Sequence, residues 1–352
     1  MNLTHGESFD RFVTRYSGQD QPDSPWRSLL EGFDPGKLRQ WAAELGVETF
    51  QATSGRVYPK SLKAAPLLRR WVERLRRLGV QFEMNHRWSG LRRESCWKLD
   101  FANQTESGAD AVVLALGGGS WKQTGSDGAW KESLEAMGIQ VHELSAANCG
   151  WEHSWPPGML AEVEGKPLKN IHVHAGTSVS IGELLITRYG LEGGAIYQLG
   201  ATLRAMPKPS IAIDFKPTFS EAQLVTKMQS VRRNFLGEAR ARWRLCDGAL
   251  AILGRKVWED APTLARETKH CVINLSRARP IDEAISSAGG VCWKELDPTL
   301  MLHKQPGVFV AGEMIDWEAP TGGYLMQGCF ATGTRAAQGA AAWVKQSGRR
   351  PS

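Results

Sequence analysis

Two apolar stretches that end in small residues constrain the fold more than any other feature of this chain: VVLALGGGS at 112–120 and GVFVAGE at 307–313. A continuous apolar run is typical of a strand buried on both faces of a parallel sheet. In open α/β sheets a ligand binds at the carboxyl ends of the strands, where glycines let the backbone approach it closely. The two junctions therefore predict an α/β fold with a ligand common to both. Glycine after a buried strand is also typical of a plain turn.

The length and the change of pattern along the chain predict a second domain. At 352 residues, about two domains are expected. From 141 to 276, short β-like stretches separated by Pro and Gly are followed by helices. Because both junctions must return to one sheet, we interpret 141–276 as an insert/substrate domain and 1–140 with 277–352 as one discontinuous domain. We expect the insert to pack beside that domain and cover the ligand, since domain interfaces favour ligand clefts.

Two helices are predicted from end signals and apolar spacing. Asp34, Pro35 and Gly46 supply the N-cap, first-turn proline and C′ glycine of a helix over 34–45. A second helix stops at Gly79, and its apolar stripe consists of Leu67, Leu68, Trp71, Val72, Leu75 and Leu78. The arginines between Arg69 and Arg77 occupy the opposite face. We interpret them as a solvated surface rather than a nucleic-acid site, because Trp71 falls on the apolar stripe and is not available for stacking.

Other local patterns complete the outline. Alternating apolar residues at 80–84 and again at 97–101 predict a small β-meander. Ser220 with Gln223 three residues later predicts a capping box. After the second glycine junction, the pattern is typical of a glycine loop and a long helix of small residues. The basic tail beyond Ser347 is expected to fray.

Several function classes are disfavoured because their motifs are absent. The sequence lacks the dinucleotide fingerprint G-x-G-x-x-G, the phosphate loop GxxxxGK[ST], and the HExxH and GxSxG signatures. The six cysteines lie far apart without a CxxC pair, so no metal site is expected. The net charge of +6 permits an anionic partner without demanding one.

The start and the apolar runs of the chain bear on its location. No uncharged apolar run approaches the roughly 18 residues that span a bilayer. The opening MNLTHGESFDRF carries acids where a signal peptide needs an apolar core. We therefore expect a cytoplasmic protein without a membrane partner. A small-molecule substrate is expected, and nucleic acid stays open as a less favoured partner. The oligomeric state stays open.

Four segments together resemble a known family. They are SGRVYPKSLKAAPLLRRW at 54–71, VVLALGGGSWKQTGSDG at 112–128, GELLITRYGLEGGAIYQLG at 182–200 and the block from 287 to 337, which contains APTGGYLMQGCFATGTRAA. Essentially end to end, the chain resembles bacterial NAD(P)/FAD-dependent oxidoreductases of the BaiN-like (aminoacetone oxidase-type) flavoprotein group. The block at 287–337 is the most specific. The resemblance implies a Rossmann-type FAD-binding domain interrupted by a β-rich plus helical insert domain.

The front of the chain departs from that family, whose members begin with a βαβ unit carrying the glycine fingerprint and then reach a G-x-N-x-T segment. Asn2-Leu3-Thr4-His5 is similar to the second half of that segment. The resemblance therefore implies a partial Rossmann-type domain that lacks about 30 or more residues of its βαβ unit. Without the contacts that hold the pyrophosphate, FAD binding is expected to be weak or absent. Two functions stay open: an FAD-dependent oxidoreductase, and a truncated, non-catalytic flavoprotein remnant.

The resemblance also implies which residues contact the cofactor. Gly312 and Glu313 resemble the glycine–acid pair that closes the FAD fold, and Gly322 to Tyr324 resemble the segment under the isoalloxazine. The full set implied at FAD is Ala115, Gly117, Gly118, Gly119, Gly289, Gly290, Gly312, Glu313, Asp316, Gly322, Gly323 and Tyr324. A tight turn or a strand-end cap is the plain structural alternative for the glycines and Glu313.

Candidate residues of the substrate cleft come from two places. Arg56 and Lys60 flank Tyr58-Pro59, and a solvated loop is their alternative. Arg188 and Tyr189, with His172 and His174, lie in the predicted insert. No catalytic residue is assigned, because a flavin carries the redox chemistry and the protein positions it. The expected activity is hydride transfer through FAD on an unknown small organic substrate, with NAD(P)H as a further cofactor that the resemblance admits.

Overall fold

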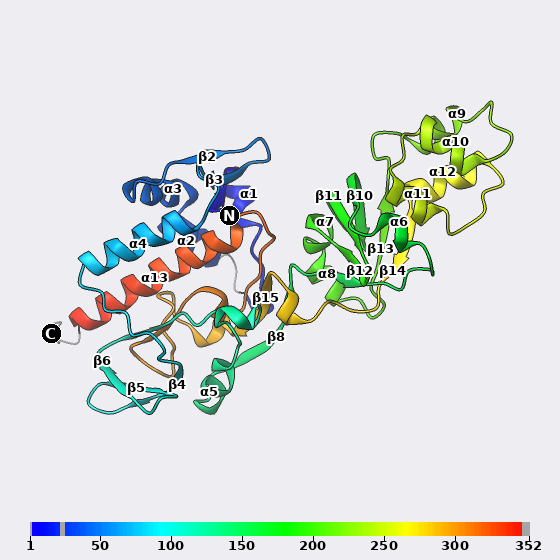
Figure 1. Ribbon diagram of the computed structural model, residues 1–352. Coiled ribbons are helices and arrows are strands. Elements are labelled where there is room, and N and C mark those ends of the chain that lie inside the picture. The colour runs from blue at the N-terminus through cyan, green and yellow to red at the C-terminus, as the bar shows by residue number, and fades with distance from the viewer. Residues whose placement is uncertain (1, 22–24, 347–352) are drawn as a thin grey trace. The chain divides into compact units, whose positions relative to one another are not determined.

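The computed structural model describes residues 2–21 and 25–346, and the chain divides into two compact units (Figure 1). Unit 1 comprises Met1–Ser145 with Ser286–Ser352, and unit 2 comprises Ala146–Ile285. Unit 2 thus begins at 146 and ends at 285, where the sequence pattern placed 141 and 276. The tail beyond Ser347 lies outside the described residues.

Unit 1 combines helices with several small sheets. Its helices are α1 (Phe9–Val13), α2 (Pro25–Gly32), α3 (Pro35–Glu44), α4 (Ala65–Arg77), α5 (Trp130–Ala136) and α13 (Tyr324–Gln346). Its strands are β1 (Thr4–His5), β2 (Thr49–Gln51), β3 (Arg56–Pro59), β4 (Trp88–Arg93), β5 (Trp97–Phe101), β6 (Glu106–Ala109), β7 (Val112–Leu114), β8 (Val141–Ala147), β15 (Ser286–Val291) and β16 (Val308–Val310). The strand orders are β1-β3-β2, β4-β5-β6, β16-β7 and β15-β8.

The parallel pair of β7 and β16 is the centre of this unit. Val308 faces Val112 and Val310 faces Leu114, and helix α13 packs against both strands. The prediction that the two glycine junctions meet on one sheet is confirmed. The prediction of a strand buried on both faces is wrong for β7, because Val113 is 40% exposed. Among the described residues only β16 pairs with β7, so this sheet is too narrow to cover both faces.

The helix signals correspond closely to the observed helices. The Asp34 carboxylate accepts a hydrogen bond from the Lys37 N–H at the start of α3, at 2.8 Å, and Gly46 adopts a positive φ of 72° after its end. In α4 the apolar stripe packs only in part. Trp71 packs edge-on against Trp41 with ring centroids 5.1 Å apart, whereas Leu68 and Leu78 are exposed.

The β-meander is present but one strand later than expected. It consists of β4, β5 and β6 in antiparallel order. Residues 80–84 form no strand, and Val80, Phe82 and Met84 are all exposed. The prediction was wrong there because alternation specifies a strand only where a neighbouring strand accepts its hydrogen bonds, and no such neighbour lies among the described residues.

An aromatic core holds unit 1 together. Trp26 stacks on Tyr16 with ring centroids 4.1 Å apart, and Trp317 meets Trp26 nearly edge-on at 5.0 Å. All three side chains are almost completely buried. This core joins α2, the loop before α13 and the strands beneath it.

Across the described residues, no helix combines the length and apolar character that a bilayer crossing requires.

Unit 2 is built on one antiparallel sheet in the order β14-β13-β10-β11-β12-β9. Its strands are β9 (Trp151–Glu152), β10 (Pro167–Ala175), β11 (Ser178–Thr187), β12 (Gly190–Glu192), β13 (Ser210–Asp214) and β14 (Cys271–Asn274). Its helices are α6 (Leu160–Val163), α7 (Gly194–Tyr197), α8 (Gly200–Arg204), α9 (Glu221–Thr226), α10 (Phe235–Arg242), α11 (Asp247–Leu253) and α12 (Ala261–Lys269). The capping box predicted at Ser220 and Gln223 is confirmed at the start of α9.

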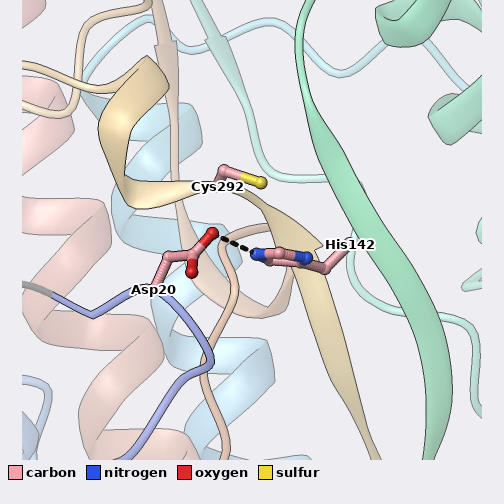
Figure 2. A group of neighbouring side chains, drawn as sticks. All are labelled: Asp20, His142 and Cys292. Atoms are coloured by element: carbon pink, nitrogen blue, oxygen red, sulfur yellow. Dashed lines mark hydrogen bonds and ion pairs between the residues drawn. The ribbon is translucent and has the colours of Figure 1, made fainter.

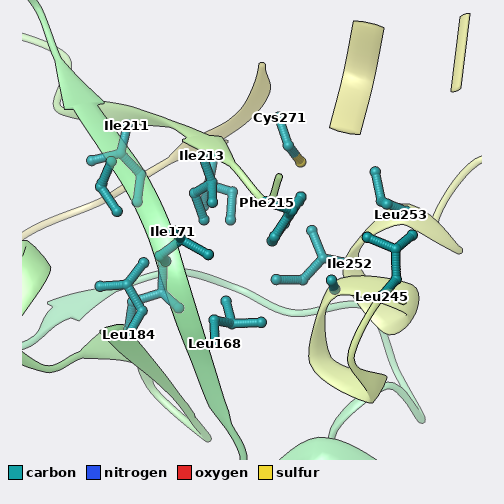
Figure 3. Close-up of a cluster of buried hydrophobic side chains, with 14 of the residues drawn as sticks. Leu168, Ile171, Leu184, Ile211, Ile213, Phe215, Leu245, Ile252, Leu253 and Cys271 are labelled. Atoms are coloured by element: carbon teal, nitrogen blue, oxygen red, sulfur yellow. The ribbon is translucent and has the colours of Figure 1, made fainter. Parts of the chain in front are cut away.

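A separate hydrophobic core fills unit 2 (Figure 3). Leu168 and Ile171 of β10 pack with Ile213 of β13, and Ile252 of α11 joins the same cluster. The two ends of the unit meet, since the Ile285 N–H donates to the Asn148 carbonyl oxygen at 3.2 Å. Both features are those of a domain inserted into another domain of the same chain.

Candidate functional site

The carboxyl ends of β7 and β16 bring a glycine loop and a buried acid together. The Ala311 N–H donates to the Leu114 carbonyl oxygen at 2.9 Å, so the segments that follow the two strands leave the sheet at the same level. The Gly119 N–H donates to the Ser287 hydroxyl at 3.0 Å. A Cβ at Gly118 would lie 1.7 Å from that hydroxyl and 3.6 Å from Glu313. A side chain at 118 would clash with the Ser287 hydroxyl, which explains the glycine there, and Glu313 lies at ordinary contact distance beyond it.

Glu313 has an unusual ionisation. Burial raises the pKa of its carboxyl to about 7, and one hydrogen bond from the Gly118 N–H opposes that shift. The neighbouring Cys329 thiol has its pKa raised to about 12, by burial first and by the negative charge of Glu313 second. Glu313 thus exchanges its proton near neutral pH at the end of the parallel pair.

The main chain by itself explains the glycines at 289 and 290. They lie within β15 with φ of +89° and +130°. A Cβ at Gly289 would lie 2.2 Å from the Glu143 carbonyl oxygen, and one at Gly290 would lie 2.5 Å from that of Met314. Close packing of three main-chain segments therefore explains both glycines, and their place at a cofactor stays a prediction.

A second cluster forms around Tyr324, at the first residue of α13. Gly322 and Gly323 precede it with φ of +127° and +110°, and a Cβ at Gly323 would lie 2.5 Å from the Thr4 carbonyl oxygen. The Tyr324 hydroxyl donates to Glu7 at 2.6 Å, and the His5 ring stacks on Tyr324 with centroids 5.2 Å apart. The loop before α13 is thus packed tightly onto β1.

Charge holds the Tyr324 hydroxyl in place. Arg15 donates to both carboxylate oxygens of Glu7, at 2.9 and 2.8 Å. Burial alone would raise the pKa of Glu7, but the hydrogen bonds from Arg15 and Tyr324 outweigh it, and the pKa is lowered. The pKa of Tyr324 is raised, by burial first and by Glu7 second. Tyr324 therefore keeps its proton across the physiological range. No motif marked Glu7 or Arg15 in the sequence, because the cluster joins residues more than 300 positions apart.

The predicted substrate residues are in different surroundings. Arg56 begins β3 as an exposed cation, and its Nε lies 3.7 Å from a Cβ built at Gly322. Lys60 is exposed and pairs with Glu48. Arg188 and Tyr189 form the turn between β11 and β12 in unit 2, where the Arg279 guanidinium lies 4.5 Å from the Tyr189 ring centroid. Of the two candidates in unit 1, Arg56 lies next to the Gly322 turn and Lys60 pairs with Glu48 instead.

Comparison with known proteins identifies the family. The model for the HI0933-like protein Rossmann domain matches residues 1–339. The chain belongs to this HI0933-like Rossmann family. A 3-dehydro-bile acid delta(4,6)-reductase from Clostridium scindens is 27% identical over 375 residues, which cover 97% of this chain and 87% of that protein. The predicted resemblance to BaiN-like flavoproteins and the α/β fold with a Rossmann-type FAD-binding domain are confirmed.

Two solved structures are more distant. The FrdA chain of E. coli quinol fumarate reductase is 12% identical with a TM-score of 0.43, and Mycobacterium smegmatis Sdh1 is 16% identical with a TM-score of 0.36. They cover 99% and 91% of this chain, which itself spans 65% and 56% of their lengths. Both TM-scores are low, so the assignment rests on the family match over 1–339. That match and the reductase relative favour an enzyme, a flavin-dependent oxidoreductase, over a non-catalytic remnant.

The residues of unit 1 fit the FAD of an HI0933-like oxidoreductase. Asn2 Oδ1 and Thr4 Oγ1 are buried and have no hydrogen-bond partner. Thr4 lies directly against Gly323, in a turn that leaves no room for a side chain. Unpaired polar atoms beside such a turn suit a flat ligand with polar edges. Glu313, a buried carboxyl that accepts a hydrogen bond from the Gly118 N–H, suits the hydroxyl groups of a ribityl chain.

Proposed function

We propose that this chain catalyses the FAD-dependent reduction of a carbon–carbon double bond conjugated with a ketone, with NAD(P)H as the electron donor. The name of the Clostridium scindens relative supports the substrate class, because 3-dehydro denotes a ketone and delta(4,6) denotes double bonds. When bound, FAD supplies two-electron chemistry by accepting hydride and delivering it. The protein contributes binding, orientation and proton control.

The Tyr324–Glu7–Arg15 cluster is the observation that carries this proposal. Reduction of a conjugated double bond places negative charge on the ketone oxygen and requires a proton on carbon. Tyr324 holds a proton at its hydroxyl, which donates to Glu7, and Arg15 holds Glu7 in place. To protonate the carbon, the hydroxyl turns from Glu7 to the substrate, and the tyrosinate then recovers a proton from solvent. The exposed Arg56 beside Gly322 supplies a cation for the ketone oxygen.

The cofactor residues are proposed on the same grounds. The loop Gly117 to Gly119 and Glu313 bind the central part of FAD, and Gly322 with Gly323 let its ring lie against the main chain near Thr4. The N–H groups at the first turn of α13 then stabilise negative charge on the reduced ring. Ala115 and Asp316 are further members of the proposed set.

Separate measurements of the two half-reactions test the proposal. The full chain is loaded with FAD, reduced without oxygen by NADH or NADPH, and then mixed with cyclohexenone or with cyclohexanone. We expect cyclohexenone to return the flavin spectrum to its oxidised form and cyclohexanone to leave it reduced. Reoxidation by both ketones at equal rates, or by neither, would contradict the substrate class.

Tyr324→Phe tests the proton source. We expect reoxidation by cyclohexenone to slow by on the order of a hundredfold, as for removal of a general acid. Reduction by NAD(P)H and the FAD content should not change. Tyr58→Phe is the matched control, since Tyr58 lies on β3 and its ring stacks on Phe50. An equal loss in both variants would remove Tyr324 from this role.

A further inference from the structure

Asp20, His142 and Cys292 bring a carboxylate, an imidazole and a thiol together in unit 1 (Figure 2). Asp20 lies in the loop after α1, His142 on β8, and Cys292 just after β15. One potential ligand atom from each residue lies within 4.8 Å of the other two. His142 Nε2 is 2.7 Å from Asp20 Oδ2. Three segments remote in sequence thus converge on one point.

Asp316 holds the loop that carries Asp20. Its Oδ2 accepts the Gln19 N–H at 2.7 Å and the Asp20 N–H at 3.4 Å, and lies 4.0 Å from His142 Nε2. Its side chain is only 2% exposed. Because that oxygen already binds two main-chain groups, Asp316 fixes the loop that carries Asp20 and adds negative charge beside His142 without serving as a ligand.

The cluster opens to solvent on one side. A surface hollow of about 560 Å³ is lined by Glu135, 138–142, Cys292 and Lys294. Cys292 itself is buried, whereas Asp20 is exposed and free to adjust. Three protein ligands with one open side are the arrangement of zinc sites that keep a fourth position for water or a substrate atom.

We propose that Asp20, His142 and Cys292 bind one divalent transition-metal ion of the Zn²⁺ class. Thiolate, imidazole and carboxylate together suit a borderline-soft ion rather than Mg²⁺ or Ca²⁺, which prefer oxygen. Tetrahedral zinc bonds of 2.0–2.3 Å place donor atoms roughly 3.3–3.8 Å apart. The Asp20–His142 contact must therefore open while the thiol closes in, and the exposed Asp20 side chain permits that movement.

Binding is coupled to proton release. The ion binds His142 as a neutral imidazole through Nε2, with the ring hydrogen on Nδ1. It also displaces the proton of the Cys292 thiol, which passes to solvent and leaves the sulfur as a thiolate ligand. Burial raises the pKa of that thiol, followed by the negative charge of Asp20. No electron is transferred, and the site needs no flavin, so its test is independent of the proposed reductase activity.

Cobalt titration of the chelator-treated full chain tests the site. Co²⁺ is the probe because a cobalt–thiolate bond gives a charge-transfer band in the near ultraviolet. We expect a saturable band at one equivalent that Zn²⁺ abolishes by displacement. Cys292→Ser should remove the band, and His142→Gln and Asp20→Asn should each weaken Co²⁺ binding at least tenfold. Cys246→Ser and His86→Gln are the matched controls and should keep full binding.

Each other outcome overturns the proposal. Absence of a saturable band in the parent chain would leave His142 as a plain ion-pair partner of Asp20. A band that survives Cys292→Ser, or one lost in Cys246→Ser, would place the metal on another thiol. Asp20→Asn changes an exposed side chain, so it keeps the test decisive if the buried Cys292→Ser variant fails to fold.

Discussion

At the scale of single residues, Glu313 carries the clearest consequence of burial. Its carboxyl lies at the end of the parallel pair of strands, where it accepts a hydrogen bond from the Gly118 N–H that favours its charged form. A carboxyl with a folded-state pKa of about 7 and an ordinary pKa of 4.5 binds its proton more tightly in the folded protein. Folding stability is therefore lost as pH rises from 4.5 through 7 and is constant above that range.

Glu313→Gln should remove this pH dependence. The shift from 4.5 to about 7 corresponds to roughly 3 kcal/mol between pH 5 and pH 8. We expect the variant to gain about that much free energy of unfolding over the parent at pH 8 relative to pH 5, because the amide has no charge to desolvate. Urea unfolding of the FAD-free proteins at both pH values measures it. Glu132→Gln is the exposed control, and an equal gain there would refute a role of burial.

FAD retention separates the functional role of Glu313 from its cost to stability. If the carboxyl binds the ribityl chain, Glu313→Ala should raise the dissociation constant for FAD at least tenfold, since one charge-assisted hydrogen bond contributes about 1.5–3 kcal/mol. The variant should therefore retain less FAD than the parent on dialysis. The absorbance of the retained flavin is the readout. Unchanged FAD content would leave Glu313 as a strand-end acid only.

At the scale of elements, the turn that leads into α13 combines strain with close packing. Gly323 has a φ of +110°, and the Thr4 main chain occupies the space where a side chain would lie. This contact attaches the start of a 23-residue helix to β1. Gln327, one turn later, donates to the Phe33 carbonyl oxygen at 2.6 Å and joins α13 to the end of α2. The position of Tyr324 depends on both contacts.

Two glycine substitutions in this region should have opposite effects. Gly323→Ala should lower the free energy of unfolding by at least about 2 kcal/mol, because a side chain there is strained and meets the backbone of Thr4. Gly333→Ala lies in the interior of α13 with nothing within 4 Å, and should raise it by about 0.5–1 kcal/mol through helix propensity. Thermal and urea unfolding provide the comparison. Equal effects of either sign would contradict the turn geometry.

At the scale of the whole molecule, unit 2 has the properties of an autonomous domain. One antiparallel sheet and its helices enclose a core of their own (Figure 3). Its ends meet at Asn148 and Ile285, so unit 1 continues on either side of a closed insert. The contribution of Arg188 and Tyr189 to substrate binding stays a prediction.

A polypeptide of residues 146–285 should therefore fold alone. We expect a far-ultraviolet circular dichroism spectrum of mixed strand and helix and one cooperative urea transition, because the core residues of unit 2 all come from within its own bounds. Leu168→Ala in that fragment should lower stability by about 2–5 kcal/mol, as expected for a fully buried leucine. A non-cooperative transition would show that unit 2 depends on unit 1.

Local chemistry let the sequence by itself determine much of this protein. Asp34, Pro35 and Gly46 specify a helix through caps that act over a few residues. The apolar runs before Gly117 and Gly312 predicted two strands of one sheet, and the family block at 287–337 pointed to a flavoprotein. These signals were sufficient because each lies within a short stretch of chain.

Tertiary structure alone decided the features that depend on distant partners. The alternation at 80–84 predicted a strand, but no strand lies beside it among the described residues. Tyr324, Glu7 and Arg15 converge only when α13 packs on the first residues of the chain, and Asp20, His142 and Cys292 converge only when β8 pairs with β15. Contacts between residues hundreds of positions apart leave no local pattern in a single sequence, because they arise from packing and not from the preferences of neighbouring residues.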